Sequence, residues 1–176
     1  MFPATTRNSQ SGPITTAAGA AAEPMDFGSG HIRPSHAADP GLIYDATYND
    51  YLVFACSSIK AQMDPSFPCP KNPPSPSNLN YPSVAVTRLS GTVNVSRTVT
   101  NVGQKRAQYK VSVNEPNGVK VEISPKFLTF KKVWEKKSFV ITLTSEVKGS
   151  GGYVAGSYTW SDGVHSVKSP IVVSVV

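Results

Sequence analysis

The chain has 176 residues, of which 39% are hydrophobic and 16% charged, with a formal net charge of +6. Its 15 prolines and 13 glycines exclude a coiled coil or a helical bundle, which would need Ala, Leu, Glu and Lys in bulk. No run of 18 apolar residues occurs, so we expect no membrane-spanning helix. The first residues lack the basic and apolar regions of a signal peptide, and the sequence therefore predicts none.

The first half of the chain is irregular. Residues 1–24 are rich in Thr, Ser, Ala, Gly and Pro, and residues 25–46 have an extended, turn-rich composition. A capping-box pattern at Thr47 then predicts a helix from about Tyr48 to Ser58, with an apolar stripe made by Leu52, Val53, Cys56 and Ile59. Residues 61–77 hold six prolines and are interpreted as a linker that covers this helix.

From residue 79 onward, apolar residues alternate with polar ones at the period of a β-strand. Turn signals separate the runs at 101–104, 115–118, 149–152 and 161–163. About seven short strands in roughly 97 residues indicate a two-sheet β-sandwich. We expect Trp134 and Trp160 to be core or near-core aromatic residues. The expected strand runs are 81–86, 93–99, 109–113, 119–123, 139–143, 158–160 and 171–176.

Charge divides the chain unevenly. Residues 1–77 carry four Lys or Arg and six Asp or Glu, whereas residues 78–176 carry thirteen and five. Lysines mostly fall singly along the expected strands, with one modest cluster at residues 131–137. This spacing favours a solvated strand face, and a binding patch is the alternative. No recognition helix, zinc pattern or RNA-binding signature accompanies the charge, so no nucleic-acid partner is predicted.

Two cysteines and one sequon are the remaining candidate sites. Cys56 and Cys69 admit three interpretations: part of a zinc site, two free thiols, or a disulfide that ties the helix end to the Pro-rich segment. The zinc interpretation is unsupported, because a structural site needs four ligands and the three histidines are scattered. Asn94 begins an Asn-Val-Ser acceptor triplet for glycosylation. No metal or cofactor site is predicted.

Catalytic motifs are absent from the sequence: it has no Gly-x-Ser-x-Gly, no Walker loop and no His-Glu-x-x-His. On the residues alone, the chain is interpreted as a β-sandwich module with an N-terminal appendage.

Several longer segments resemble the plant subtilisin-like serine proteases. The longest is residues 27–45, FGSGHIRPSHAADPGLIYD, and it continues as residues 50–56, DYLVFAC. Three further segments match: residues 79–83 (LNYPS), residues 97–103 (RTVTNVG) and residues 160–173 (WSDGVHSVKSPIVV). The resemblance implies that residues 78–176 are a fibronectin type-III-like β-sandwich, mainly β. It further implies that residues 1–60 are the incomplete C-terminal remnant of the α/β peptidase domain with one helix, followed by the linker 61–77.

The same resemblance implies that catalysis lies elsewhere. The Gly-Thr-Ser-Met motif with the family's nucleophilic serine is missing, and so are the segments with the catalytic Asp and His, so this chain is expected not to be an enzyme. His31 matches a structural histidine. The family pattern also implies that Cys56 and Cys69 are bridged.

Two functions follow. The first is the C-terminal region of a secreted, extracellular endopeptidase that stabilises a catalytic domain, its expected partner. The alternative is a stand-alone, non-catalytic module that binds protein or cell-wall polymer. We expect residues 78–176 to fold alone and residues 1–60 not to; substrate and oligomeric state do not follow from the sequence.

Overall fold

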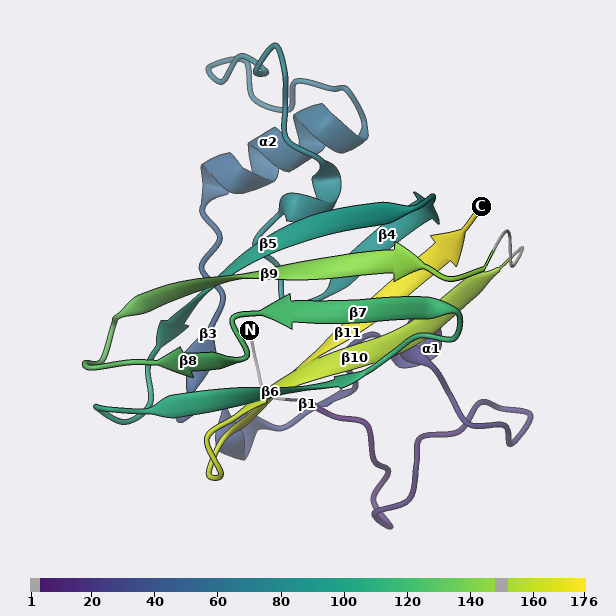
Figure 1. Ribbon diagram of the computed structural model, residues 1–176, viewed down its shortest axis with the longest axis vertical. Coiled ribbons are helices and arrows are strands. Elements are labelled where there is room, and N and C mark those ends of the chain that lie inside the picture. Colours follow the sequence, from purple (N-terminus) through teal and green to yellow (C-terminus); the bar gives the residue numbers. More distant parts are fainter. Residues whose placement is uncertain (1–3, 148–151) are drawn as a thin grey trace.

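The computed structural model describes residues 4–147 and 152–176, and it is a two-sheet β-sandwich (Figure 1). This confirms the predicted fold class, a mainly β sandwich. The expected Gly-rich connection at 149–152 lies, except for Gly152, outside the described residues.

One sheet has five strands in the order β4-β11-β10-β6-β8, and the other has four in the order β3-β5-β9-β7. Neighbouring strands are antiparallel except β4 and β11, which are parallel. The five-stranded sheet consists of β4 (Val84–Leu89), β11 (Ser166–Val175), β10 (Tyr153–Ser161), β6 (Gln108–Asn114) and β8 (Phe127–Thr129). The four-stranded sheet consists of β3 (Leu42–Ile43), β5 (Thr92–Asn101), β9 (Lys136–Ser145) and β7 (Val119–Ser124).

The core lies between the two sheets and comes from the alternating apolar residues. Strand β7 shows the pattern most simply, because Val119, Val121 and Ile123 are buried while the residues between them are exposed. Phe139 from one sheet meets Trp160 from the other edge to face, with ring centroids 5.1 Å apart. Alternation therefore decides which face of each strand fills the core.

Three features differ from the sequence-based expectation. The sandwich has β3 and β8 in addition to the seven expected strands. The sequence analysis did not predict them, because both are too short for alternation to be visible. Trp160 is buried as predicted, but the expectation for Trp134 is wrong: its side chain is 69% exposed. Trp134 lies in the turn before β9 with a positive φ of 65°, and this backbone turns the indole outward.

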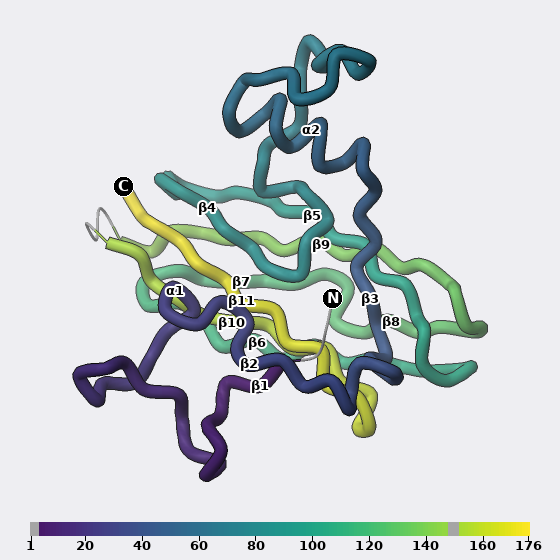
Figure 2. Tube along the Cα trace, turned by 180° about the vertical axis from the view of Figure 1, so that it is seen from behind, coloured from purple at the N-terminus to yellow at the C-terminus, as the bar shows by residue number. Residues whose placement is uncertain are grey.

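The predicted helix is α2 (Tyr48–Ser58), and its capping box is formed by Thr47 and Asp50. Of its expected apolar stripe, Leu52 and Cys56 are buried, whereas Ile59 is 63% exposed. Figures 1 and 2 show α2 outside both sheets, on the side of β4 and β5. It is followed by the Pro-rich segment and a short 3-10 turn, η2 (Pro76–Asn78).

The N-terminal segment runs along the outside of the sandwich (Figure 2). It contains a two-stranded pair, β1 (Ala4–Thr5) and β2 (His31–Ile32), and a 3-10 turn, η1 (Pro34–His36). It also contains α1 (Pro24–Phe27), a single helical turn that the sequence analysis did not predict and that contacts β11. Met25 and Ile32 are 63% and 58% exposed, so this segment leaves apolar side chains uncovered.

Candidate functional site

Residues 39–45, which we call the strap, lie against the sandwich and bring together the segments that the sequence analysis singled out. Leu42 and Ile43 pair with Asn101 and Thr100 of β5, so the strap supplies the edge strand of the four-stranded sheet. Leu42 is 3% exposed and belongs to the same apolar core as the sandwich. Because burial of a leucine side chain stabilises by about 1.5–3 kcal/mol, the strap is an integral part of the sandwich.

The turn into the strap requires glycine at position 41. The carbonyl of Gly41 accepts hydrogen bonds from the backbone N–H groups of Val102 and Gly103, at 2.9 and 3.0 Å. Its φ is +74°, and a Cβ here would lie 2.7 Å from the Cβ of His165. Any side chain would collide with the β10–β11 hairpin, so the close approach of strap and sandwich depends on Gly41.

Tyr44 continues the strap into a buried polar cluster. Its hydroxyl lies 2.9 Å from that of Tyr158 and 3.2 Å from that of Ser169, both on the five-stranded sheet. Burial raises the pKa of Tyr44, and burial also raises the pKa of Tyr158. Both phenols are therefore neutral hydrogen-bonding groups that connect the strap to β10 and β11.

Arg97 of β5 is a buried cation, 3% exposed, and every hydrogen bond of its guanidinium goes to a main-chain carbonyl. Nε donates to Tyr81 at 2.9 Å, Nη2 to Ser83 at 2.9 Å, and Nη1 to Ser77 and Ser96 at 2.8 Å each. Burial lowers the pKa of Arg97, but the group stays charged. The single side chain thus holds the 77–83 segment on β5.

Asn80 and Asp45 complete the contact on the same side. Asn80 Nδ2 donates to the carbonyls of Asp45 and Thr98, and its Oδ1 accepts from the N–H of Thr98. The hydroxyl of Thr100 donates to the Asp45 carboxylate, which also pairs with Lys136 at 2.9 Å. The hydrogen bond from Thr100 and the neighbouring Lys136 lower the pKa of Asp45.

The start of the strap is held by a histidine between two carboxylates. His165 is 8% exposed; its Nδ1 lies 2.8 Å from Asp162 Oδ2, and its Nε2 lies 3.1 Å from Asp39 Oδ1. The second contact is short enough for an ion pair, although the ring N–H is not aligned as a hydrogen bond. Burial opposes the charge, but the two carboxylates outweigh it and raise the pKa of His165.

This Asp–His–Asp arrangement is not a nucleophile with its base. Ser161 is adjacent in sequence to Asp162, but its hydroxyl donates to the backbone carbonyl of His165 and not to the imidazole ring. Both ring nitrogens face carboxylates, so neither can take a proton from a serine. Within residues 4–147 and 152–176, no group of three or more His, Cys, Asp or Glu could hold a metal ion.

We expect Asp39→Asn to destabilise the protein more in acid than in base. His165 has a raised pKa in the folded state, so its pairing stabilises fully below the unfolded value and this stabilisation is lost as the pH rises through the folded value. Because Asp39 is exposed, the loss should be only about 0.5–1 kcal/mol near pH 5 and smaller near pH 9. Urea unfolding of both proteins at the two pH values measures it. An equal loss at both values would contradict the pairing.

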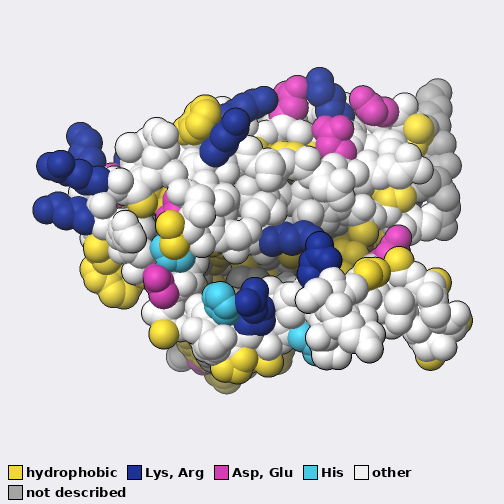
Figure 3. All heavy atoms as spheres, turned by 90° about the horizontal axis from the view of Figure 1, so that it is seen from below, with side chains coloured by type: hydrophobic (Ala, Val, Ile, Leu, Met, Phe, Trp, Pro, Cys, Tyr) yellow, Lys and Arg dark blue, Asp and Glu magenta, His cyan; other side chains and the backbone are white. Residues whose placement is uncertain are grey.

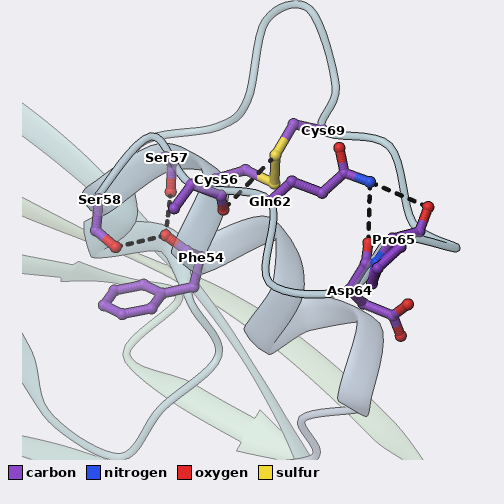
Figure 4. Close-up of a disulfide and its surroundings, with 9 residues drawn as sticks. Phe54, Cys56, Ser57, Ser58, Gln62, Asp64, Pro65 and Cys69 are labelled. Atoms are coloured by element: carbon purple, nitrogen blue, oxygen red, sulfur yellow. Dashed lines mark hydrogen bonds between the residues drawn. A yellow bond between two sulfur atoms is a disulfide. The ribbon is translucent and has the colours of Figure 1, made fainter.

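Cys56 and Cys69, the two candidate cysteines, lie in contact at the end of α2 (Figure 4). Their sulfur atoms are 2.02 Å apart and their Cα atoms 5.6 Å apart, and the described residues contain no free cysteine. Gln62 holds the loop between them by donating to the carbonyls of Asp64 and Pro65. The bridge therefore closes the Pro-rich segment onto the helix.

Protein made in an oxidising compartment should carry this bridge in solution. The intact mass under non-reducing conditions is expected to be two hydrogens below that of the thiol form, because one S–S bond replaces two S–H bonds. Alkylation before and after reduction provides the control. Two alkylatable thiols in unreduced secreted protein would show that the bridge does not form.

Asn94 lies on β5 with its side chain exposed on the outer face of the four-stranded sheet. Its Oδ1 accepts a hydrogen bond of 2.9 Å from the hydroxyl of Thr142 on β9. The side-chain nitrogen to which a glycan would be attached is not held by this bond, so the site is accessible.

Sequence reasoning missed most residues of this site. It singled out the segments that contain the strap, Asn80, Arg97 and His165, but it assigned none of them a contact. Arg97 carried the one usable signal, because it shares a strand face with Val95 and Val99, and a cation on a buried face needs hydrogen-bond acceptors. No helix among the described residues is long and apolar enough to span a bilayer.

Comparison with known proteins matches these features to a family. The protein-family model of the fibronectin type-III domain matches residues 78–173 of this chain. The subtilisin-like protease SBT5.6 of Arabidopsis thaliana is 44% identical over 96% of this chain, and SBT5.5 of the same plant is 42% identical over 100% of it. Subtilisin-like serine-protease S of Lotus japonicus is 40% identical over 90% of the chain. The chain spans only 22–23% of the length of these relatives.

Proposed function

The chain belongs to the fibronectin type-III domain family and corresponds to the C-terminal part of plant subtilisin-like proteases, and from this premise we propose that it is a stabilising module for a peptidase domain. Peptide-bond hydrolysis is the activity of the whole protein in this proposal, and the peptidase domain is the partner. In this proposal, residues 1–60 come from the end of that domain and residues 61–77 link it to the sandwich. Residues 78–176 form most of the sandwich, and the strap within residues 1–60 completes it.

The observation that carries the proposal is the convergence of the family-like segments at the strap. The segments 79–83, 97–103 and 160–173 are separate in sequence from the strap, yet each supplies contacts to residues 39–45. Arg97 also joins two of these segments by its hydrogen bond to Tyr81. These contacts include a buried arginine, a buried histidine and a glycine with no room for a side chain. Such a set fixes the sandwich to the segment that precedes it.

The N-terminal segment supplies the other half of the argument. Met25 of α1 and Ile32 of β2 are exposed apolar side chains on short elements that make few contacts with the sandwich. Two-residue strands and a single helical turn are not stable without a larger partner. In this proposal, the sheet of the peptidase domain covers them.

The chain itself is proposed to be inactive as a peptidase. Reaction with a fluorophosphonate probe for serine hydrolases tests this, and the expected result is no labelling, because no serine hydroxyl is hydrogen-bonded to an imidazole nitrogen among the described residues. Labelling that a single serine substitution abolishes would overturn the proposal of inactivity.

We assign the protein to the extracellular space, since the Cys56–Cys69 bridge suits an oxidising compartment. Asn94 should then carry a glycan in protein passed through a eukaryotic secretory pathway. Peptide N-glycosidase treatment is expected to lower the mass of the wild-type chain and to leave Asn94→Gln unchanged. Unglycosylated wild-type protein in the medium would contradict the glycosylation of Asn94, and retention of the chain inside the cells would contradict the extracellular assignment.

The experiment for the main proposal uses a relative as host. SBT5.6 lacking the part that corresponds to this chain should unfold at a temperature several degrees lower and be secreted poorly, and grafting this chain in its place should restore both. Grafts with Arg97→Met should fail to restore them, whereas the exposed substitution Arg88→Met should restore them. If the shortened peptidase is as stable and as well secreted as the intact one, the stabilising function is wrong.

The alternative, a stand-alone module that binds protein or cell-wall polymer, is distinguished by the same set. It predicts a soluble, folded chain whose grafting has no effect on the host peptidase.

A further inference from the structure

One end of the sandwich carries an exposed aromatic ring among positive charges. The loop 102–107 follows β5, the loop 130–135 follows β8, and the N–H of Phe130 donates to the carbonyl of Ala107 at 2.8 Å, so the two loops lie side by side. Figure 3 shows Lys and Arg side chains gathered at one end of the molecule. We call this surface the basic end; it consists of Lys105, Arg106, Lys131, Lys132, Val133 and Trp134.

The cations of the basic end are uncompensated. Lys105, Arg106, Lys131 and Lys132 are exposed, and in the described part of the chain their side chains have no ion pair or hydrogen bond. The nearby carboxylate of Glu135 is occupied, because it accepts from the backbone N–H of Lys131 at 2.6 Å and pairs with Lys137 at 3.0 Å. Four positive charges therefore face solvent together and attract anions.

The backbone that carries the ring on this surface is held in place. Trp134 has a φ of 65°, a conformation that is rare for a bulky residue and persists only where the surroundings enforce it. The backbone N–H of Trp134 donates to the backbone carbonyl of Asn101 at 2.7 Å. Asn101 is fully buried, and its Nδ2 donates to the carbonyls of Gln104 and Lys132, one on each loop. A buried amide thus fixes both loops and presents the indole outward.

From this arrangement we propose that the basic end binds an acidic polysaccharide, a chain of uronic acid units. The face of an indole is electron-rich and attracts the polarised C–H groups on the face of a pyranose ring, whereas it does not attract a carboxylate. A uronic acid unit offers both groups at once: a ring face for Trp134 and a carboxylate for the neighbouring Lys and Arg side chains.

Other polyanions satisfy only part of this surface. An anionic membrane uses clusters of about four to eight cations together with a sizeable apolar face, but here the apolar side chains are only Trp134 and the partly exposed Val133. An acidic polypeptide would use the charges and leave the ring without a partner. A nucleic acid can use both, but the oxidising compartment of a disulfide-bridged protein does not favour it.

Isothermal titration of the 176-residue chain with a soluble oligogalacturonate tests the proposal. Binding should be measurable at low salt and weaken as salt rises, because salt screens the attraction between the charges of the two partners. Trp134→Asn, a residue that tolerates positive φ, should weaken binding about tenfold, and Trp134→Tyr should retain most of it. Lys131→Gln with Lys132→Gln should also weaken it about tenfold, since each lost pair costs a few-fold.

Matched controls come from surfaces remote from the basic end. Tyr153 at the start of β10 is 52% exposed, and Lys60 and Lys71 lie exposed beside α2. Tyr153→Ala and Lys60→Gln with Lys71→Gln should leave the affinity unchanged. Polyglutamate of equal charge, phosphatidylserine vesicles and a single-stranded oligonucleotide are compared under the same conditions. Absence of oligogalacturonate binding, equal or tighter binding of any of these three, or an unchanged affinity of Trp134→Asn would each overturn the proposal.

Discussion

Replacement of Arg97 by methionine is expected to produce the largest loss of stability of any single substitution proposed for this protein. The variant leaves the part-buried carbonyls of Tyr81, Ser83 and Ser77 without their donor. An unsatisfied buried polar group costs about 1–3 kcal/mol, so the free energy of unfolding should fall by about 3–5 kcal/mol. Urea unfolding followed by tryptophan fluorescence measures it, because Trp160 lies in the core.

Two further variants separate the hydrogen bonds from the charge. Arg97→Lys keeps a positive charge but replaces the planar guanidinium with a single ammonium group, so it should lose most of the same free energy. Arg88→Met is the matched control, since the exposed side chain of Arg88 has no hydrogen bond or ion pair among the described residues. It should change stability by less than about 0.5 kcal/mol. A loss below about 1 kcal/mol for Arg97→Met would show that water replaces the guanidinium.

Replacement of Leu42 by alanine is expected to cost about 2–5 kcal/mol, the usual range for a leucine in a packed core. Leu42 is 3% exposed and packs in the same core cluster as the strands of the sandwich. Ile32→Ala is the control, because this side chain is 58% exposed and a change there should stay within about 0.5 kcal/mol. Equal effects of the two substitutions would mean that the strap is only loosely attached in solution.

The same reasoning changes the expectation for shortened chains. The sequence analysis expects residues 78–176 to fold alone, but this fragment would lose β3 and the hydroxyl of Tyr44 that lies against Tyr158 and Ser169. We therefore expect residues 39–176 to be more stable than residues 78–176 by at least the cost of Leu42→Ala. Urea unfolding of both fragments compares them, and equal midpoints would support a self-sufficient unit beginning at residue 78.

Local patterns determined the elements that are regular over several residues. The capping box and the spacing of apolar residues were sufficient for α2, because both signals lie within the helix itself. Alternation was sufficient for β7 and for the other long strands, because side chains alternate between the two faces of a strand and the apolar ones therefore mark the buried face. The family resemblance likewise followed from contiguous residues, and the fibronectin type-III match confirms it for the sandwich.

Only the tertiary structure decided how these elements meet. Strand β3 has two residues, too few for a period, and it exists because Asn101 and Thr100 of a distant strand offer it partners. Trp134 is a large aromatic residue of the kind usually found in a core, but its left-handed backbone conformation, held by the hydrogen bond to Asn101, directs the side chain to solvent. Alternation specifies the face that a strand buries, yet it carries no information on which distant segment covers an open edge or which way a turn presents its side chain, since both depend on contacts between residues remote in sequence.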